Sequence, residues 1–585
     1  MKVNKYIISA LVCPFVLGSC ADWDDWKYDV EKPQTIAQYE YLNDYAPLKE
    51  YLDRGAHPGF KVSAALGADE FNQQGPLFRL AAHNFDEIVA GNAMKMASCV
   101  NDQGVMDFSK VSSFVSAAED AGLTVYGHTL AWHAQQPRKY LNELIKDKQL
   151  PPAVEIPVSV GHLTFDDGQN LGGWGMDNTP KIVNGVCEVG NNAAKENPWN
   201  AQVCYEPGFA FENGKTYHLK MKIKGSVAGE FGAGFQNPEG YQGCGDFPTI
   251  NVTTDWKEVD VTTTCNGDNA LRLLLNIGKY PGTLYIDDFE VYYTKSSDGI
   301  PLTPQEKSDT LTWAMNKWIS GMMQATGGKV KAWDLINEAV SGGGNVNGYY
   351  ALQTEATSEH NPQDFYWQDY FTPEMYGPIV EKAARDAYAA VEGTNPEDLK
   401  LFINDYNLES DWDDNKKVKS LVYWIGVWEK KGQELGWNTK IDGIGSQMHI
   451  SYYENEQTLE SKKKAIQNML KIMAETGKLV RISEIDMGYV DKDGKDVTTA
   501  QLEKLPIEER VAKEKAMAEH YKWIIEQYFK IVPVSQQYGI CQWCLTDSPT
   551  DSGWRPGQPV GLWNLNYQRK PAYGGFADGL ANKQQ

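Results

Sequence analysis

The chain has 585 residues, which is too long for one ordinary domain and indicates two or three. Its formal net charge of -23 argues against nucleic acid and anionic membrane surfaces as partners, because both would repel it. Hydrophobic residues make up 42% of the sequence, which is enough for substantial cores. The 18 Trp and 31 Tyr provide flat apolar faces that suit stacking on sugar rings, although many will be core residues.

The N-terminus carries the pattern of a targeting segment. A basic start at Lys2 and Lys5 precedes an apolar run, Tyr6 to Leu17, that is too short to span a bilayer. The run ends in Leu17-Gly18-Ser19-Cys20, which resembles a bacterial lipobox, and the acidic stretch that follows is similar to surface-export signals of Bacteroidetes lipoproteins. We therefore expect a signal peptide over 1–19, lipidation at Cys20, a tether over 20–40, and a lipid-anchored, surface-exposed location on the outer membrane. An ordinary secretory signal with a chance cysteine is the alternative.

Seven of the nine cysteines lie beyond this segment. Outside the cytoplasm disulfides can form, and the four cysteines between 187 and 265 could pair in three ways. The Cys541-x-x-Cys544 pair lies in an apolar strand without a second Cys or His pair. A structural role is therefore favoured over redox or metal chemistry for that pair.

Eight apolar stretches alternate with helical patterns along most of the chain. Amphipathic helices are predicted at 109–121, 373–391 and 507–529. Eight such strands separated by helices predict an α/β fold, a closed (β/α)8 TIM barrel, over 41–151 and 299–585. Barrels of this kind place their chemistry where the strands end. The expected strands are 60–66, 85–89, 123–128, 330–336, 399–404, 441–447, 479–486 and 538–543.

Between 152 and 298 the helical periodicity disappears and short alternating stretches replace it. Residues 216–224, 257–262 and 284–291 alternate with period 2, which is typical of strands with one buried face. Many short strands with Gly and Asn turns predict an inserted all-β sandwich. Because the insertion follows the third barrel strand, we expect it to emerge on the active face of the barrel.

Two of the predicted barrel strands run into a glutamate, Glu338 and Glu484. A carboxyl at the end of a buried strand is costly to desolvate, and burial raises its pKa toward the range of a proton donor. The pair suggests the two carboxylates of a retaining glycosidase. The alternative is that both are ordinary carboxylates facing solvent.

Four motifs resemble glycoside hydrolase family 10, chiefly endo-β-1,4-xylanases, over roughly 45–150 and 300–580. Residues 333–339 (WDLINEA) resemble the acid/base motif, and 482–486 (ISEID) resemble the nucleophile motif, with Ser where Thr is usual. Residues 127–133 (GHTLAWH) and 443–449 (GIGSQMH) resemble the blocks around the third and sixth strands. Gly91 stands where the family often has Glu.

The resemblance implies roles for individual residues. Glu484 would be the nucleophile that forms a covalent glycosyl-enzyme, and Glu338 would be the acid/base. His449 and Asp486 would keep Glu484 ionised, and Asn337 would bond the sugar 2-hydroxyl. No cofactor is expected for catalysis, core packing is the alternative for the Trp residues, and the role of Arg555 stays open. Tyr406 resembles a platform for sugars on the acceptor side. The expected substrate contacts are Asn92, Lys95, His128, Trp132, Gln135, Tyr406, Gln447, Trp543, Trp554 and Arg555.

The insert resembles carbohydrate-binding modules of families 4, 9 and 22, through 165–168 (FDDG), 286–290 (IDDFE) and the pattern around Trp174. Two carboxylates, Asp167 and Asp288, are expected to meet and to hold a structural Ca²⁺, with a solvated acidic edge as the alternative. A domain that only packs on the barrel is the alternative to a binding role. The residues expected to bind xylan are Trp199, Phe235, Gln236 and Tyr241.

The sequence thus predicts an endo-acting, retaining xylanase that takes xylan and xylo-oligosaccharides. Its other expected partners are the membrane lipid anchor and further surface glycan-utilisation proteins. One alternative is a β-glucanase of the same fold. A catalytically weak glycan-binding lipoprotein is the other, and the presence of both glutamates disfavours it.

Overall fold

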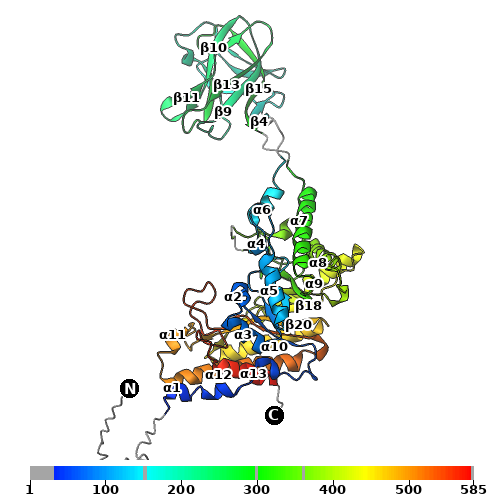
Figure 1. The fold of residues 1–585 in the computed structure, drawn as a ribbon. Helices are drawn as coiled ribbons and strands as arrows, with labels where there is room; N and C mark the ends of the chain where they lie inside the picture. The colour runs from blue at the N-terminus through cyan, green and yellow to red at the C-terminus, as the bar shows by residue number, and fades with distance from the viewer. Residues whose placement is uncertain (1–31, 149–154, 297–300, 359–360, 362, 582–585) are drawn as a thin grey trace, which may run out of the picture. The chain divides into compact units, whose positions relative to one another are not determined.

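The structure is a computed structural model that describes residues 32–148, 155–296, 301–358, 361 and 363–581. The predicted signal peptide and Cys20 lie outside these residues. The chain divides into two compact units, one of Lys146–Thr303 and the other of Met1–Ile145 with Pro304–Gln585 (Figure 1). Among the described helices, none is long and apolar enough to cross a membrane.

The larger unit is the predicted parallel barrel. Each strand pairs in parallel with its neighbours in the order β18-β17-β16-β3-β2-β1-β21-β20, and β18 also pairs with β20, so that the sheet closes. The prediction of a (β/α)8 barrel is therefore confirmed. The barrel strands are β1 (Lys61–Ala65), β2 (Glu87–Val89), β3 (Thr124–Gly127), β16 (Ala332–Asn337), β17 (Lys400–Asp405), β18 (Gly443–Ser446), β20 (Leu479–Val490) and β21 (Gln537–Gln542).

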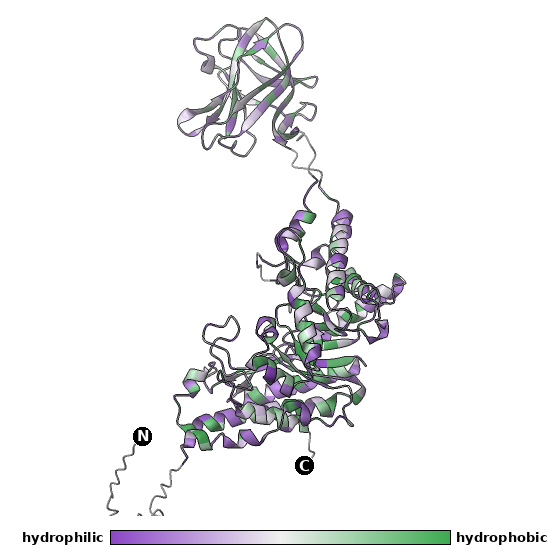
Figure 2. Cartoon of the chain, viewed as in Figure 1, coloured by the Kyte–Doolittle hydropathy of each residue, from purple (hydrophilic) through white to green (hydrophobic). Residues whose placement is uncertain are grey.

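Helices surround the strands and turn an apolar side toward them. In Figure 2 the larger helices carry hydrophobic and hydrophilic residues along the same length, as expected for an outer layer with one buried face. Local sequence sets several helix ends; at the start of α10, for example, the side chain of Asn455 accepts a hydrogen bond from the Thr458 N–H. The helices are α1 (Gln34–Ala37), α2 (Ala68–Asn72), α3 (Pro76–Asn84), α4 (Met96–Cys99), α5 (Ser109–Asp120), α6 (Arg138–Leu144), α7 (Pro304–Ala325), α8 (Pro373–Ala389), α9 (Lys416–Glu434), α10 (Glu456–Glu475), α11 (Thr499–Leu502), α12 (Ile507–Ile531) and α13 (Pro571–Ala581).

One strand extends the sheet beyond the barrel. The strand β19 (His449–Tyr453) pairs in parallel with the second half of β20, from Asp486 to Val490. The strand that carries Glu484 is therefore longer than predicted, and Glu484 lies within it rather than near its end. The extra pairing fixes the segment that begins at His449 against the segment that begins at Asp486.

The smaller unit is a sandwich of two six-stranded antiparallel sheets. One sheet has the order β11-β10-β14-β8-β5 with β12 beside β10, and the other has β13-β9-β15-β7-β6 with β4 beside β15. Both sheets contribute to one buried core, so the predicted inserted sandwich is confirmed. Its strands are β4 (Glu155–Leu163), β5 (Gly172–Trp174), β6 (Asn178–Val183), β7 (Val186–Gly190), β8 (Gln202–Tyr205), β9 (Thr216–Gly225), β10 (Gly229–Asn237), β11 (Gln242–Asp246), β12 (Ile250–Val252), β13 (Lys257–Thr264), β14 (Arg272–Asn276) and β15 (Thr283–Ser296).

The seven cysteines of the described chain are free thiols. The four in the insert form no disulfide, although the sequence left three pairings open. Burial raises the pKa of Cys187 and of Cys204 to about 11, so that both stay protonated and unreactive at neutral pH. Cys541 is fully buried in the barrel, in agreement with a structural role.

Candidate active site

The two glutamates of the sequence motifs meet at the carboxyl ends of the barrel strands. Glu338 directly follows β16, and Glu484 lies in β20; both line a groove of about 1390 Å³. Glu338 has a φ of 55°, in the left-handed region that a non-glycine residue adopts only at a cost. Its backbone N–H donates to the Asn404 carbonyl at 2.7 Å, which holds this conformation in place.

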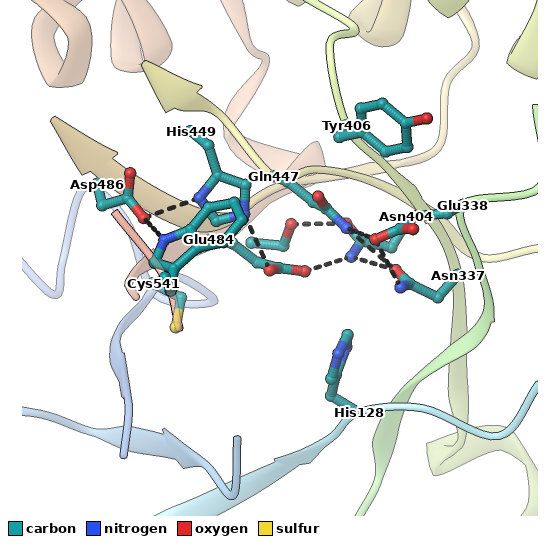
Figure 3. Close-up of polar contacts among 12 residues, drawn as sticks. His128, Asn337, Glu338, Asn404, Tyr406, Gln447, His449, Glu484, Asp486 and Cys541 are labelled. Carbon is teal, nitrogen blue, oxygen red and sulfur yellow. Dashed lines mark hydrogen bonds and ion pairs between the residues drawn. The ribbon is translucent and has the colours of Figure 1, made fainter. Parts of the chain in front are cut away.

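A chain of amides connects the two carboxylates (Figure 3). The Asn404 Nδ2 donates to Glu484 Oε1 at 2.8 Å and to Asn337 Oδ1 at 2.9 Å. The Gln447 Nε2 donates to Glu338 Oε1 at 2.9 Å, and to Asn337 Oδ1 at 3.3 Å. These bonds orient both carboxyl groups before a substrate arrives, as preorganised sites require.

The environment of Glu338 suits a proton donor. Burial raises the pKa of its carboxyl above the ordinary value, and the negative charges of Asp405 and Glu484 raise this pKa further. Hydrogen bonds from Gln447 and from the Trp132 Nε1, at 3.0 Å, stabilise the ionised form and partly oppose the shift. The net direction is upward, so Glu338 keeps its proton to higher pH than a free glutamate.

The environment of Glu484 has the opposite effect. Burial alone would raise its pKa, but hydrogen bonds from His449 and Asn404, together with the charge of His449, leave the pKa below its ordinary value. His449 is itself buried, which lowers its pKa, but its contacts with Asp486 at 2.8 Å and Glu484 at 3.3 Å raise that pKa to about 10. At neutral pH a cationic imidazole therefore lies between two carboxylates, and Glu484 is ionised.

Asp486 has hydrogen-bond donors in addition to His449. It accepts hydrogen bonds from the Trp554 Nε1 at 2.9 Å and from the Arg555 Nη1 at 2.5 Å. Arg555 also donates to the Ser451 Oγ at 2.8 Å, and so joins β19 to the loop after β21. Arg555, whose role the sequence left open, thus supports Asp486 in addition to lining the groove.

All of the predicted substrate contacts of the barrel line this groove. The Lys95 Nζ donates to Asn92 Oδ1 at 2.8 Å and lies 4.8 Å from the centre of the Trp132 ring. The His128 Nδ1 contacts Asp334 at 2.8 Å, and Figure 3 shows the His128 ring directed toward the two glutamates. The structure therefore brings these residues together on one groove, and their contacts with a sugar stay a prediction.

Three polar residues that support the site were not predicted. Asn404 bridges the two carboxylates, Ser483 donates to Asn404 Oδ1 at 2.6 Å, and Asp334 accepts from Tyr126 and contacts His128. Asn404 could have been found, because it is a polar residue near the end of a buried strand, the same signal that singled out Glu338. Asp334 and Ser483 are buried strand residues, and no sequence signal separates them from ordinary interior polar groups.

Gly91, the departure from the family pattern, has a structural reason in this chain. Its φ is +56°, and a Cβ there would lie 3.2 Å from the Leu66 carbonyl oxygen. A glutamate at this position would be strained in the present backbone. Glycine is therefore compatible with the groove as it stands.

The predicted sugar-binding residues of the insert lie in different environments. Trp199 is 61% exposed and Tyr241 is 75% exposed, as expected. Phe235 is 1% exposed and packs in the core, so its prediction as a sugar contact is wrong. It is in β10, where alternate residues face opposite sides; Phe235 faces the core, and its neighbour Gln236 bonds the Arg272 side chain at 3.0 Å.

An aromatic and cationic cluster on the insert was not predicted. The Arg272 guanidinium lies 5.1 Å from the centre of the Trp174 ring and 5.7 Å from that of Tyr241. Trp174 is 40% exposed, whereas Arg272 is only 9% exposed. The cluster could not be found from the sequence because its members come from β5, β14 and the turn before β11, which are far apart along the chain.

The two carboxylates expected to bind calcium have other surroundings. Asp288 forms an ion pair with Lys222 and lies 3.7 Å from His162. Among the described residues, no group of three or more His, Cys, Asp or Glu side chains is arranged to hold a metal ion. The geometry gives no support to a site at Asp167 and Asp288, which stays an untested prediction.

The groove holds two carboxyl groups whose pKa values are shifted in opposite directions, an arrangement that glycosidases use. Residues 52–158 and 297–579 match the model of glycosyl hydrolase family 10, with the gap at the insert. The match covers more than half of the chain, which therefore belongs to glycosyl hydrolase family 10.

Curated relatives are similar over part of their length. An endo-β-1,4-xylanase of Cellvibrio japonicus is 28% identical over 272 residues, which is 44% of this chain and 38% of that protein. An endo-1,4-β-xylanase A of Fusarium oxysporum f. sp. lycopersici is 27% identical over 276 residues, 46% of this chain and 66% of that protein. A protein of Acetivibrio thermocellus named as an exoglucanase is 26% identical over 251 residues, 42% of this chain and 17% of that protein. The chain thus matches between 17% and 66% of the length of these relatives.

Two solved structures align with this chain at low sequence identity. Native xylanase 10C from Cellvibrio japonicus aligns with a TM-score of 0.47 and 17% identity, over 91% of this chain and 73% of that one. A family 10 structure from Paenibacillus barcinonensis aligns with a TM-score of 0.48 and 18% identity, over 89% of this chain and 94% of that one.

Proposed function

We propose that this family 10 protein is an endo-acting, retaining xylanase that cleaves internal β-1,4 bonds of xylan. The observation that carries the proposal is the pair of carboxyl groups with opposite pKa shifts, Glu338 raised and Glu484 lowered, on one groove. A double displacement needs one protonated acid and one ionised nucleophile at the start of the cycle.

In the first step an oxygen of Glu484 attacks the anomeric carbon, and the bond from that carbon to the leaving oxygen breaks. Glu338 gives its proton to the leaving oxygen, so the shortened chain departs as an alcohol and a glycosyl-enzyme ester remains. In the second step Glu338, now ionised, takes a proton from water. The water oxygen attacks the same carbon and releases Glu484 as a carboxylate. Two inversions at one carbon retain its configuration.

Xylan is supported as the substrate by the names of two relatives and by the polar and aromatic lining of the groove. A β-glucanase is the competing proposal, because the Acetivibrio thermocellus relative carries the name of a glucanase. Product analysis on xylan, arabinoxylan, carboxymethylcellulose and mixed-linkage glucan separates the two. Release of xylo-oligosaccharides of several lengths early in the reaction is expected; release of glucan fragments alone would favour the glucanase, and no release would favour a glycan-binding protein.

We further propose that the insert binds xylan through its outer sheet face. In β14, Leu273 and Leu275 face the core, so Arg272 and Asn276 face the other side, together with Gln236. The exposed rings of Trp174 and Tyr241 could stack on sugars from either side of Arg272. Polar side chains between aromatic faces suit a hydroxyl-rich ligand.

The test uses the full chain with Glu484→Ala, so that bound polymer is not degraded. Trp174→Ala with Tyr241→Ala is expected to weaken retention on insoluble xylan by about tenfold or more. Trp256→Ala is the matched control, because Trp256 is 45% exposed and lies on the loop before β13, in the other sheet. Equal retention by all variants would remove this face from the proposal.

The location and the metal stay proposals as well. We propose that Cys20 carries the lipid that anchors the protein to the outer membrane. Cys20→Ala is expected to release the protein into the soluble fraction, and unchanged membrane fractionation would contradict this.

For a calcium ion in the insert, a chelator is expected to lower the melting temperature of the insert. An unchanged melting temperature would exclude that site.

A further inference from the structure

Trp412 lies in the loop between β17 and α9 and has the largest exposed fraction of any described tryptophan, 65%. The loop leaves the carboxyl end of β17, the side of the barrel on which the groove lies. An indole exposed to this extent contributes little free energy through apolar burial unless a ligand covers it. Trp412 is therefore a candidate ligand contact, provided that the loop holds it in a fixed place.

The loop is anchored from within. Leu408 is fully buried, and the Asn415 Nδ2, also buried, donates to the Leu408 carbonyl and to the Ala465 carbonyl of α10, both at 3.1 Å. The loop is thus bonded both to itself and to a barrel helix. Its exposed tryptophan is presented by a rigid segment, which lowers the entropic cost of binding.

The indole also has a fixed support. The Lys462 Nζ, from α10, bonds Asp411 at 2.6 Å, and Ser461 donates to the same carboxylate at 2.8 Å. This ion pair holds Lys462 with its Nζ 5.0 Å from the centre of the Trp412 ring and 5.9 Å from that of Tyr453. One ammonium group therefore lies near two aromatic rings, one from the loop after β17 and one from the end of β19. We refer to Trp412 and Tyr453 as the aromatic platform.

The aromatic platform continues two segments that line the groove. Tyr406 and Asn407 line the groove at the start of the loop that carries Trp412. His449 lines it at the start of β19, and Tyr453 ends that strand about 13 Å further along, at 3.3 Å per residue. Trp412 is thus five positions along the chain from Asn407, and Tyr453 four from His449, both of which line the groove. Tyr406, at the start of the first segment, is the residue for which the family resemblance implies an acceptor-side position.

We propose that the aromatic platform is a distal acceptor subsite that binds the part of a β-1,4-linked xylose chain lying beyond Tyr406. The sugar faces would stack on Trp412, with Tyr453 beside it. This inference rests on the proposed xylanase activity. Its consequence is a preference for long chains, because binding energy from a remote part of the substrate is available to position the bond at Glu338 and Glu484.

The experiment measures kcat/KM for xylohexaose and for an aryl xylobioside, whose aryl group replaces the acceptor sugars and does not extend beyond the start of the acceptor side. The readout is the ratio of the two values. For Trp412→Ala this ratio is expected to fall by about five- to tenfold, whereas Trp412→Phe, which keeps an aromatic face, should recover part of it. Cleavage of xylohexaose by Trp412→Ala should also shift toward bonds that leave fewer sugars on the acceptor side.

Trp437→Ala is the matched control. Trp437 is 37% exposed, has the Lys382 Nζ 6.0 Å from its ring centre, and follows α9 on the way into β18, at the opposite end of the barrel. It should keep the wild-type ratio. An unchanged ratio and cleavage pattern in Trp412→Ala would overturn the subsite, while a wild-type protein that cleaves neither substrate would overturn the proposed xylanase activity itself.

Discussion

The Nδ1 of His449 lies 2.8 Å from an oxygen of Asp486, and this contact keeps the imidazole cationic beside the proposed nucleophile. Without the Asp486 charge, the pKa of His449 would fall, and its stabilising effect on ionised Glu484 would weaken. The acidic side of the pH profile therefore depends on a residue that does not touch the reacting carbon. Asp486 is in this sense a positioning residue.

Asp486→Asn tests this relationship. Glu484 must be ionised to attack, so activity is lost as the pH falls through its pKa, which the site holds below the ordinary value. The substitution removes a charge that keeps His449 protonated, so the pKa of Glu484 should rise and the acidic limb of kcat/KM should move to higher pH. A loss of about 10²-fold in kcat/KM at the optimum is expected. Asp493→Asn, at an exposed position, is the control; an acidic limb that does not move would argue against this role of Asp486.

Trp132→Phe tests the basic limb. Glu338 must be protonated to give its proton, so activity is lost as the pH rises through its pKa, which burial raises. The Trp132 Nε1 stabilises the ionised form from 3.0 Å. Without this bond the pKa of Glu338 should rise further, and the basic limb of kcat/KM should move up by about half a unit or more. A shift to lower pH would contradict the assignment of Glu338 as the acid.

The division of labour between the two glutamates is open to a direct test. Glu484→Ala is expected to abolish turnover of every substrate, by about 10⁵-fold or more, because no covalent intermediate can form. Glu338→Ala should still release a good aryl leaving group and then accumulate the glycosyl-enzyme. With added azide, this variant should yield a glycosyl azide of retained β configuration, which NMR identifies. An α product would indicate inversion, and equal loss in both variants would remove the distinction between their roles.

The sequence was sufficient for the barrel and the insert because each leaves a local signal, whereas most of the groove residues were expected only through the resemblance to family 10 motifs. The two glutamates end or lie in apolar strands, and the insert changes the hydrophobic period from helical to alternating. The Arg272 cluster of the insert leaves no such signal, because it joins residues from separate strands. Phe235 was misassigned for a related reason: a one-residue difference in register decides which side chain of a strand faces the core.

The interior of the barrel contains a buried ion pair, Arg481 with Glu87, that was not predicted from the sequence. Arg481 is completely buried, and its Nη1 donates to Glu87 Oε1 at 2.6 Å; Ser63 and Tyr538 donate to the same carboxylate at 2.9 Å each. The guanidinium carbon lies 3.6 Å from the centre of the Tyr126 ring. An arginine inside an apolar strand gives no indication of its partner, which is 394 positions away in the chain.

Glu87→Gln should therefore destabilise the barrel. Removing one charge leaves Arg481 buried without its counter-ion, at a cost of about 3–5 kcal/mol in the free energy of unfolding. Adding Arg481→Met should recover part of that loss, because the unpaired charge is removed as well. Denaturant unfolding of the two variants measures both effects. A double variant less stable than Glu87→Gln would show that Arg481 contributes chiefly through its contacts with the tyrosine rings.

The insert is expected to assist the cleavage of long or insoluble polymers. It interrupts the chain between α6 and α7, so a polymer bound to the insert, as proposed, would remain tethered to the barrel. Tethering replaces bulk substrate concentration by a higher local one, and this matters for an insoluble or long polymer but not for a short soluble one. Replacing Lys146–Thr303 by a short Gly/Ser linker should leave kcat/KM on xylotetraose within about twofold and lower the rate on insoluble xylan by about tenfold. Equal losses of activity on both substrates would mean that the insert supports the fold of the barrel. Unchanged activity on both substrates would mean that polymer binding by the insert does not assist cleavage.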